Sequence, residues 1–248
     1  MKIYEYGNQN KSKILLIHGM WMTHEMMLPY VDQLMDDYHI IAPDLTGHGN
    51  DKGRFESAQK EAAEITDWLM QNQMKELALV FGVSLGSVIA MNVISHEELL
   101  HTHCAVMEGA SLTCVYGVEW LFRAMFREMK KRPETIANLY ASMQDWMQMY
   151  SRSFWTRWRI RIKRSFSIWY MPAIAIRLKN ARFRRSCSDT YFFEFRNRDS
   201  HLVCQKAIRK YYPEAKIATR KGYGHCGYMF AHGKDYAALL RSYMEKEK

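Results

Sequence analysis

A serine between two glycines, in the run Gly82-Val83-Ser84-Leu85-Gly86, constrains this chain more than any other segment. An apolar run precedes it at residues 77–81, and a helix-like apolar stretch follows it at residues 88–94. A serine at such a strand-to-helix turn must stand on a tight, strained backbone with its hydroxyl pointing out. Glycine two residues to either side leaves room for the chain to turn that sharply. The pattern is that of a nucleophile elbow, and it predicts Ser84 as a nucleophile. The amide of Leu85 would then point at charge that develops on a substrate oxygen.

Short apolar runs recur along the chain in a way that suits a parallel sheet covered on both faces. Helix-like patterns, such as the one over residues 57–73, lie between these runs. The alternation predicts a doubly wound, mostly parallel α/β sheet. The strands in this series are expected at residues 13–17, 38–42, 77–81, 104–107, 190–195 and 216–219, and further helices at residues 200–211 and 230–245.

Residues 112–186 break the alternation. They are rich in Met, Trp, Arg and Tyr, and they hold 16 Lys and Arg against 4 Asp and Glu, or +12, whereas the whole chain carries +9. The basic character therefore belongs to one segment and is no property of the whole fold. We expect an α/β core formed by residues 1–111 and 187–248, with a mainly helical, basic cap inserted at residues 112–186.

One stretch of this cap places five apolar side chains on a single helical face with arginines around them. This face can cover an acyl pocket while the arginines stay in water, which is the interpretation we favour. It can also lie on an anionic membrane, or turn its arginines toward an anionic substrate. We expect no nucleic-acid binding, because no motif accompanies the charge. The face consists of Trp155, Trp158, Ile162, Phe166 and Trp169.

Other features of the sequence indicate the size of the core and the cellular location of the protein. A chain of 248 residues suffices for one large core plus an insertion. Its five cysteines are an odd number without paired or zinc-like spacing, which favours reduced thiols in the cytoplasm. The first residues do not resemble a signal peptide, and the longest uncharged stretch, residues 77–94, is interrupted by the glycine-rich turn. We therefore expect a cytoplasmic protein without a transmembrane anchor.

Two later residues complete a recognisable chain order with Ser84. His225 follows the last expected strand in a glycine-flanked loop, and Asp199 follows the strand expected at 190–195. The order serine, then acid, then histidine is the one expected of α/β-hydrolases. With its motifs in view, the chain resembles the α/β-hydrolase superfamily, in the branch of serine esterases and thioesterase-like enzymes with a helical cap. The resemblance covers roughly residues 1–111 and 187–248 and is carried by His18-Gly19, Asp44-Leu45-Thr46-Gly47-His48-Gly49, Gly82 to Gly86, and Gly224-His225.

The resemblance implies a role for each candidate residue. Ser84 attacks a carbonyl carbon, His225 takes its proton as general base, and Asp199 holds the imidazole. The backbone amides of Met20 and Leu85 form the oxyanion hole. No metal or organic cofactor is implied. His18 is expected to order the loop that carries Met20, without a catalytic role of its own.

The acid has alternatives. Superfamily members often carry glycine three positions before the aspartate, and this chain carries Arg196 there. Glu108 is the alternative acid, because some relatives place the acid after the strand that follows the elbow. Glu194 is a third and weaker choice, since an inward-facing strand carboxylate would be a costly buried charge.

The sequence thus predicts a serine hydrolase that cleaves a carboxylic ester or thioester through an acyl-enzyme. A lyase or C–C bond hydrolase that uses the same three residues stays open. So does a ligand receptor with little turnover on the same fold. The acyl length, the leaving group and the oligomeric state are left open.

Overall fold

The computed structural model describes residues 1–20, 22–49, 51, 53–96, 98–110, 188–196, 208–210, 212–220, 222–223 and 225–245. The expected cap at 112–186, its apolar face and Asp199 lie outside these residues. The boundary between core and cap therefore stays a prediction.

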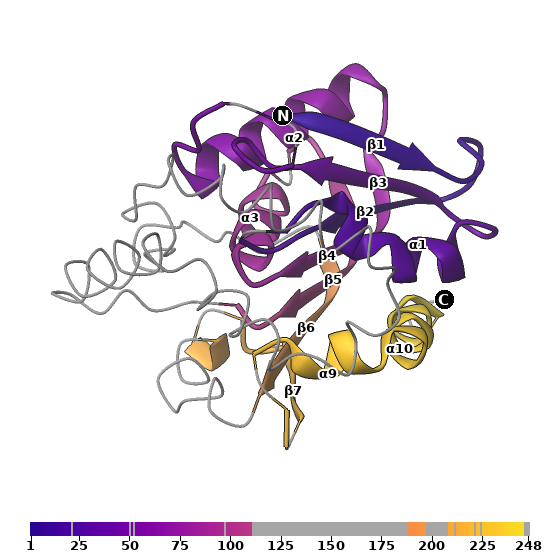
Figure 1. Ribbon diagram of the computed structural model, residues 1–248, viewed down its shortest axis with the longest axis vertical. Helices are drawn as coiled ribbons and strands as arrows, with labels where there is room; N and C mark the ends of the chain where they lie inside the picture. The colour runs from indigo at the N-terminus through magenta and orange to yellow at the C-terminus, as the bar shows by residue number, and fades with distance from the viewer. Residues whose placement is uncertain are drawn as a thin grey trace, which may run out of the picture.

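A twisted sheet forms the middle layer of the described structure (Figure 1). Its seven strands are arranged in the order β1-β3-β2-β4-β5-β6-β7. The edge strand β1 is antiparallel to β3, and all other neighbours are parallel. This is the expected mostly parallel α/β architecture. The strands are β1 (Lys2–Tyr6), β2 (Lys13–Ile17), β3 (His39–Asp44), β4 (Glu76–Val83), β5 (His101–Glu108), β6 (Ser188–Arg196) and β7 (Lys216–Arg220).

Helices cover both faces of the sheet (Figure 1). One face carries α2 and α3, which pack against each other, and the other carries α1 and α10. The 3-10 turn η1 leads into α1, and the short α9 leads into α10. The bounds are η1 (His24–Met27), α1 (Leu28–Leu34), α2 (Ala58–Gln71), α3 (Leu85–Val93), α9 (Gly227–Ala231) and α10 (Gly233–Glu245).

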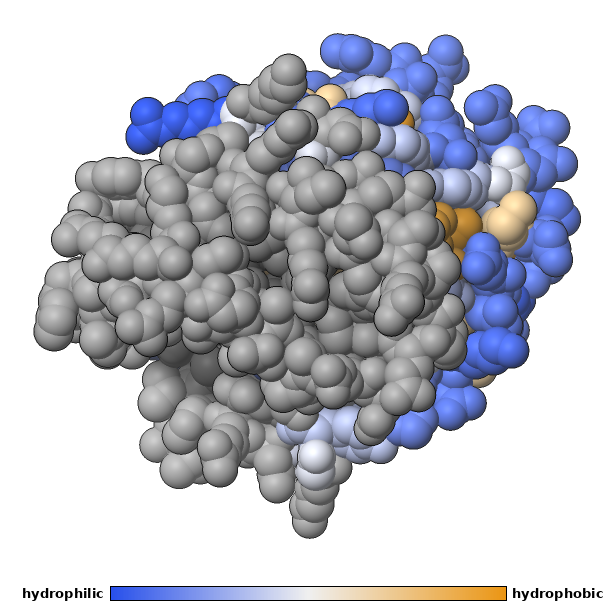
Figure 2. Space-filling view, in the orientation of Figure 1, coloured by the Kyte–Doolittle hydropathy of each residue, from blue (hydrophilic) through white to orange (hydrophobic). Residues whose placement is uncertain are grey.

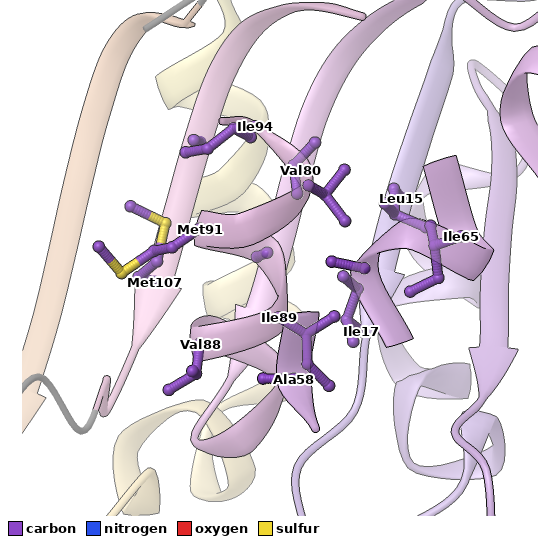
Figure 3. Packing of buried hydrophobic residues seen from close by; sticks show 14 of the residues in the cluster. Leu15, Ile17, Ala58, Ile65, Val80, Val88, Ile89, Met91, Ile94 and Met107 are labelled. Carbon is purple, nitrogen blue, oxygen red and sulfur yellow. The ribbon is translucent and has the colours of Figure 1, made fainter. Parts of the chain in front are cut away.

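The continuous apolar strands follow from this layering. Successive side chains of a strand point to opposite faces, so both faces must be apolar when helices cover both. In β2, Leu15 and Ile17 join the buried cluster with α2 and α3, while Ile14 and Leu16 join the cluster with α1 and α10. Figure 3 shows Leu15, Ile17 and Val80 of the first cluster beside the helical side chains that cover them. Each such side chain stabilises the fold by roughly 1.5–3 kcal/mol.

Helix α2 illustrates how a helix is set on the sheet. The Ser57 hydroxyl caps its first turn by accepting a hydrogen bond from the Lys60 N–H at 3.1 Å. Ala58, Ala62 and Ile65 are spaced three and four residues apart and lie fully buried, with less than 2 % of each exposed. The helix therefore covers the strands with a mainly apolar face and leaves Lys60 and Asp67 exposed, whereas the buried Glu61 carboxylate accepts a hydrogen bond from the Thr46 N–H at 3.0 Å.

The six strands expected from the sequence are present, and several are longer than the apolar runs alone indicated. The expected single helix at 230–245 is in fact two, because α9 ends at Ala231 and α10 starts at Gly233. The sequence analysis missed β1 and α1. β1 is a partly exposed edge strand with charged residues, and α1 has only seven residues with Pro29 in its first turn.

The described surface seen in Figure 2 is mostly hydrophilic. Among the described residues, the exposed large hydrophobic side chains are Met35 and Leu99. Within the same residues, no helix has both the length and the apolar character needed to span a bilayer.

Candidate active site

Ser84 stands on a strained turn between the central strand β4 and helix α3. Its φ of 53° and ψ of −110° lie outside the regions that residues with a side chain ordinarily adopt. The turn is fixed to the neighbouring strand, because the Ser84 N–H donates to the Glu108 carbonyl at 2.8 Å. The Ser87 hydroxyl, one turn into α3, lies within hydrogen-bonding distance of the carbonyls of Gly82 and Glu108. Strain of this kind persists only where the surroundings determine it, and it is typical of functional sites.

The two glycines of the motif are required by close approach. A Cβ on Gly82 would lie 2.3 Å from the Gly86 carbonyl oxygen. A Cβ on Gly86 would lie 2.2 Å from the carbonyl oxygen of Ile17, at the end of β2. Both distances are far inside van der Waals contact, so the elbow can form only with glycine at these positions.

His225 reaches Ser84 from the far end of the chain. It lies in the loop between β7 and α9, and its Nε2 is 2.9 Å from the Ser84 Oγ. Its ring also lies against the backbone that follows β5, since a Cβ on Gly109 would sit 2.8 Å from the His225 Cε1. A neutral imidazole with Nε2 free of hydrogen can accept the serine proton at this distance. The structure therefore brings together the two residues that the sequence analysis paired.

The two predicted oxyanion amides belong to segments that adjoin this serine. Leu85 is the first residue of α3, so its N–H has no carbonyl partner within the helix. Met20 follows Gly19, whose backbone is so close to the elbow that a Cβ there would lie 3.4 Å from the Ser84 Cβ. The formation of an oxyanion hole by these two N–H groups stays a prediction, in which both would stabilise the charge on a substrate oxygen.

His18 fixes the peptide that carries the Met20 amide. Its Nε2 accepts a hydrogen bond from the Leu45 N–H at 3.1 Å, so Nδ1 carries the hydrogen and donates to the Gly19 carbonyl at 2.7 Å. The Gly19 carbonyl and the Met20 N–H belong to one planar trans peptide, so holding one sets the direction of the other. Burial lowers the pKa of His18 to about 4, which keeps the ring neutral in this role.

A second connection fixes the far end of the same loop. The Asp44 Oδ1 accepts hydrogen bonds from the His24 backbone N–H and from the His24 Nδ1, each at 2.8 Å. Burial by itself raises the pKa of Asp44, but the hydrogen bonds from His24 and the nearby His18 outweigh it and leave the pKa below its usual value. The loop after β2 is thus fastened at both ends to the consecutive residues Asp44 and Leu45. Nothing in the sequence pointed to His24, because its partner is recognisable only in the folded chain.

Two of the three candidate acids, Glu108 and Glu194, lie in strands that the structure describes, whereas the third, Asp199, does not. Glu108 ends β5 and is buried, and its Oε2 accepts a hydrogen bond from the Tyr236 hydroxyl at 2.8 Å. Asp199 lies outside the described residues, and β6, the strand before it, ends at Arg196. Glu194 lies within β6, opposite Glu108 in the parallel pairing.

A separate hollow of about 600 Å³ lies at the opposite, amino-terminal edge of the parallel strands. Ser84 and His225 do not line it, so we do not place the candidate site there. Among the described residues, no group of three or more His, Cys, Asp or Glu is placed to hold a metal ion. The hollow is lined by Asn10, Lys11, Ser12, Lys13, Gln73, Met74, Lys75, Glu76, Ala78 and His103.

A mostly parallel sheet with a serine on the strained turn after its central strand, and a late histidine against it, defines the hydrolase class of α/β proteins. The chain belongs to the alpha/beta hydrolase family, whose model matches residues 14–239.

Individual relatives agree with this assignment. An (E)-2-((N-methylformamido)methylene)succinate hydrolase from Acinetobacter baylyi is 30% identical over 100 residues, which are 39% of this chain and 37% of that protein. The matched part thus spans little more than a third of the curated relative. An alpha/beta hydrolase family protein from Desulfitobacterium hafniense has a TM-score of 0.74 at 16% identity, over 97% of this chain and 99% of its own. The esterase RhEst1 from Rhodococcus sp. ECU1013 has a TM-score of 0.73 at 15% identity, over 99% of this chain and 94% of its own. These structural likenesses establish the fold.

Proposed function

We propose that this protein is a serine hydrolase that cleaves a carboxylic ester or thioester through an acyl-enzyme intermediate. The observation that carries the proposal is the 2.9 Å approach of the His225 Nε2 to the Oγ of Ser84, a residue held at a φ of 53°. A serine hydroxyl is a weak nucleophile by itself, and an adjacent imidazole activates it. The strained turn presents the hydroxyl at the end of the sheet, where a substrate carbonyl can approach.

The reaction takes place in two halves. The Ser84 Oγ attacks the carbonyl carbon while its proton passes to the His225 Nε2, and the oxyanion is held by the N–H groups of Met20 and Leu85. The imidazolium then protonates the leaving alcohol or thiol, and the acyl group stays on Ser84. Water next gives a proton to His225 and attacks the acyl carbon, and the collapse of this second intermediate releases the acid and restores Ser84. Asp199 holds the imidazolium through Nδ1, with Glu108 as the alternative acid.

Two further parts of the proposal concern substrate and setting. The predicted cap at 112–186 is strongly basic, and the Acinetobacter relative is named for a succinate derivative, a dicarboxylate. Both support an anionic or acyl-bearing small molecule as substrate. We place the protein in the cytoplasm because its five cysteines are an odd number without paired spacing, which favours reduced thiols.

The proposal is tested with nitrophenyl esters of acyl chains from C2 to C16, with Ser84→Ala and His225→Ala as controls. We expect wild-type turnover and fluorophosphonate labelling, both lost in Ser84→Ala. A chain-length optimum would report the pocket size, and faster turnover of a succinate monoester than of the neutral ester would report an anionic substrate. Folded wild-type protein that neither turns over any ester nor reacts with the fluorophosphonate would refute the proposal.

A second candidate uses the same serine and histidine on a C–C bond next to a carbonyl, as a C–C hydrolase or a lyase. The Acinetobacter relative is named for a substrate that is not an ester, which supports keeping a reaction other than ester cleavage. Turnover of a β-diketone without turnover of esters would select this candidate. Folded protein that neither turns over any of these compounds nor reacts with the fluorophosphonate would instead indicate a low-turnover receptor.

A further inference from the structure

The loop that carries His225 has a backbone that does not hold its shape unaided. It connects β7, which ends at Arg220, to α9, which starts at Gly227. Gly222 has a φ of 85° and Cys226, directly after the histidine, has a φ of 56°. For a residue with a side chain, this left-handed conformation costs roughly 1–2 kcal/mol. Contacts elsewhere in the loop must therefore offset the strain and fix the position of the imidazole between these two bends.

One side of the loop is fixed by burial. The Cys226 side chain is only 1 % exposed, and its Sγ lies 3.9 Å from the Glu108 carbonyl oxygen. Its sulfur also lies against Gly109, where an added Cβ would come within 2.8 Å of it. This anchors the residue after His225 to the end of β5, the strand whose Glu108 carbonyl also holds the Ser84 amide.

The other side of the loop is fixed by a polar contact. The Tyr223 hydroxyl lies 2.7 Å from the Nε2 of His232, the residue that directly follows α9. The other ring nitrogen of His232, Nδ1, lies 3.7 Å from the Asp235 carboxylate. A neutral His232 with its hydrogen on Nδ1, toward this carboxylate, leaves Nε2 to accept the tyrosine proton. This side-chain hydrogen bond thus connects the segment before α9 to the segment after it.

Aromatic contacts hold the tyrosine ring in the same place. The Tyr223 ring meets Tyr228 edge-on, with centroids 5.1 Å apart, and meets His232 at 5.5 Å. The guanidinium of Arg220, at the end of β7, lies 4.8 Å from the Tyr228 ring centre. These contacts restrict the Tyr223 ring. The hydrogen bond from its hydroxyl to His232 then orients the backbone two residues before His225.

We propose that Tyr223 and His232 form a latch that positions the His225 imidazole against Ser84, so that both are positioning residues for the hydrolytic reaction. The inference rests on the proposed function, because it assigns a purpose to the exact placement of the general base. It goes beyond it by naming two residues that lie outside the family motifs. Neither side chain is expected to touch the substrate.

The latch predicts a specific kinetic pattern. A misplacement of about 1 Å in a reacting group can cost about 100-fold in rate. Tyr223→Phe removes only the hydroxyl and keeps the ring, so we expect kcat on the best nitrophenyl ester to fall about 10- to 100-fold while KM stays within about twofold. The rate of fluorophosphonate labelling should fall in parallel, because it depends on the same imidazole.

Three further variants make the test selective. His232→Leu removes the acceptor and should reproduce the loss, whereas His232→Gln offers an amide oxygen and should recover most of kcat. Tyr228→Phe removes a hydroxyl from the same aromatic group without touching the latch, and it should keep kcat within about twofold of wild type. Thermal unfolding of all four variants reports whether the fold is intact.

The outcomes separate this inference from the proposed function. If wild type is active, Ser84→Ala is inactive and Tyr223→Phe keeps full kcat, the latch is refuted and the hydrolase stands. Equal losses in His232→Gln and His232→Leu would also refute it. If wild type is neither active nor labelled, the proposed function and the latch fall together.

Discussion

The Nε2 of His225 lies 2.9 Å from the Oγ of Ser84, although 141 positions separate the two residues in the chain. The approach is possible because β4, β5, β6 and β7 run parallel and end at the same edge of the sheet. The loops that follow β4 and β7 therefore meet there, on either side of the residues that follow β5. Parallel α/β sheets build their sites at this edge for the same reason.

The strained backbone at Ser84 predicts that glycine at this position gives a more stable protein than alanine, although both variants lose activity. Ser84→Ala and Ser84→Gly should both be inactive, but only glycine adopts a φ of 53° without strain. We expect Ser84→Gly to have a free energy of unfolding about 1 kcal/mol higher than Ser84→Ala. Urea unfolding of the two variants measures the difference. A lower stability for Ser84→Gly would mean that the turn stores no strain.

The triad acid can be assigned by a pair of matched amide variants. We expect Asp199→Asn to lower kcat by about 10⁴-fold, because the histidine loses the group that orients it and stabilises its charged form. Glu108→Gln should keep most of the activity, since the amide oxygen can still accept the Tyr236 hydroxyl that Glu108 now binds. Kinetics on the best nitrophenyl ester decides between them. The reverse pattern would make Glu108 the acid.

The parts of the fold that the sequence predicted are those whose burial is uniform. β2, β4 and α3 are covered on both sides, so their residues are mostly apolar, and the strand-to-helix turn at Ser84 stands out between β4 and α3. β1 has exposed Lys2 and Glu5 and lies at the edge of the sheet, so its apolar signal is weak. Its place is set by pairing with β3, which is a property of the folded chain.

The candidate site likewise contains residues that the sequence marks and residues that only the folded structure reveals. Ser84 and His225 could be found because glycines and their position after strands mark them locally. His24 and Asp44 are 20 positions apart, and Tyr223 and His232 are nine apart across a helix. Their pairing depends on how the loops fold back on one another, and single-residue patterns do not encode that.

The buried histidines predict a loss of stability in mild acid. Burial lowers the pKa of His18 to about 4 and of His48 to about 3, whereas both take up protons near pH 6.5 once unfolded. Between pH 6.5 and 4 the unfolded chain therefore binds more protons than the folded one, so the free energy of unfolding falls as the pH falls.

Each of these histidines should contribute a loss of about 2 kcal/mol between pH 7 and pH 5. Urea unfolding at the two pH values measures it. His48→Asn has no proton to gain at this position, so its pH-dependent loss should be about 2 kcal/mol smaller than that of wild type. Equal losses in the variant and in wild type would contradict the assignment.

The close contact at Gly86 predicts a large difference in stability between two glycine-to-alanine variants. A Cβ on Gly86 would meet the Ile17 carbonyl oxygen at 2.2 Å, so Gly86→Ala must push α3 away from β2 and should cost about 3 kcal/mol of stability or more. A Cβ on Gly227, the first residue of α9, would come no closer than 3.5 Å to its neighbours. Gly227→Ala should therefore have a free energy of unfolding within about 0.5 kcal/mol of wild type.

Chemical denaturation of both variants measures the difference. If Gly86→Ala is too unstable to purify, its soluble yield compared with that of Gly227→Ala gives the same ranking. Equal stability of the two variants would show that the tight contact between α3 and β2 is not needed to form the turn that presents Ser84.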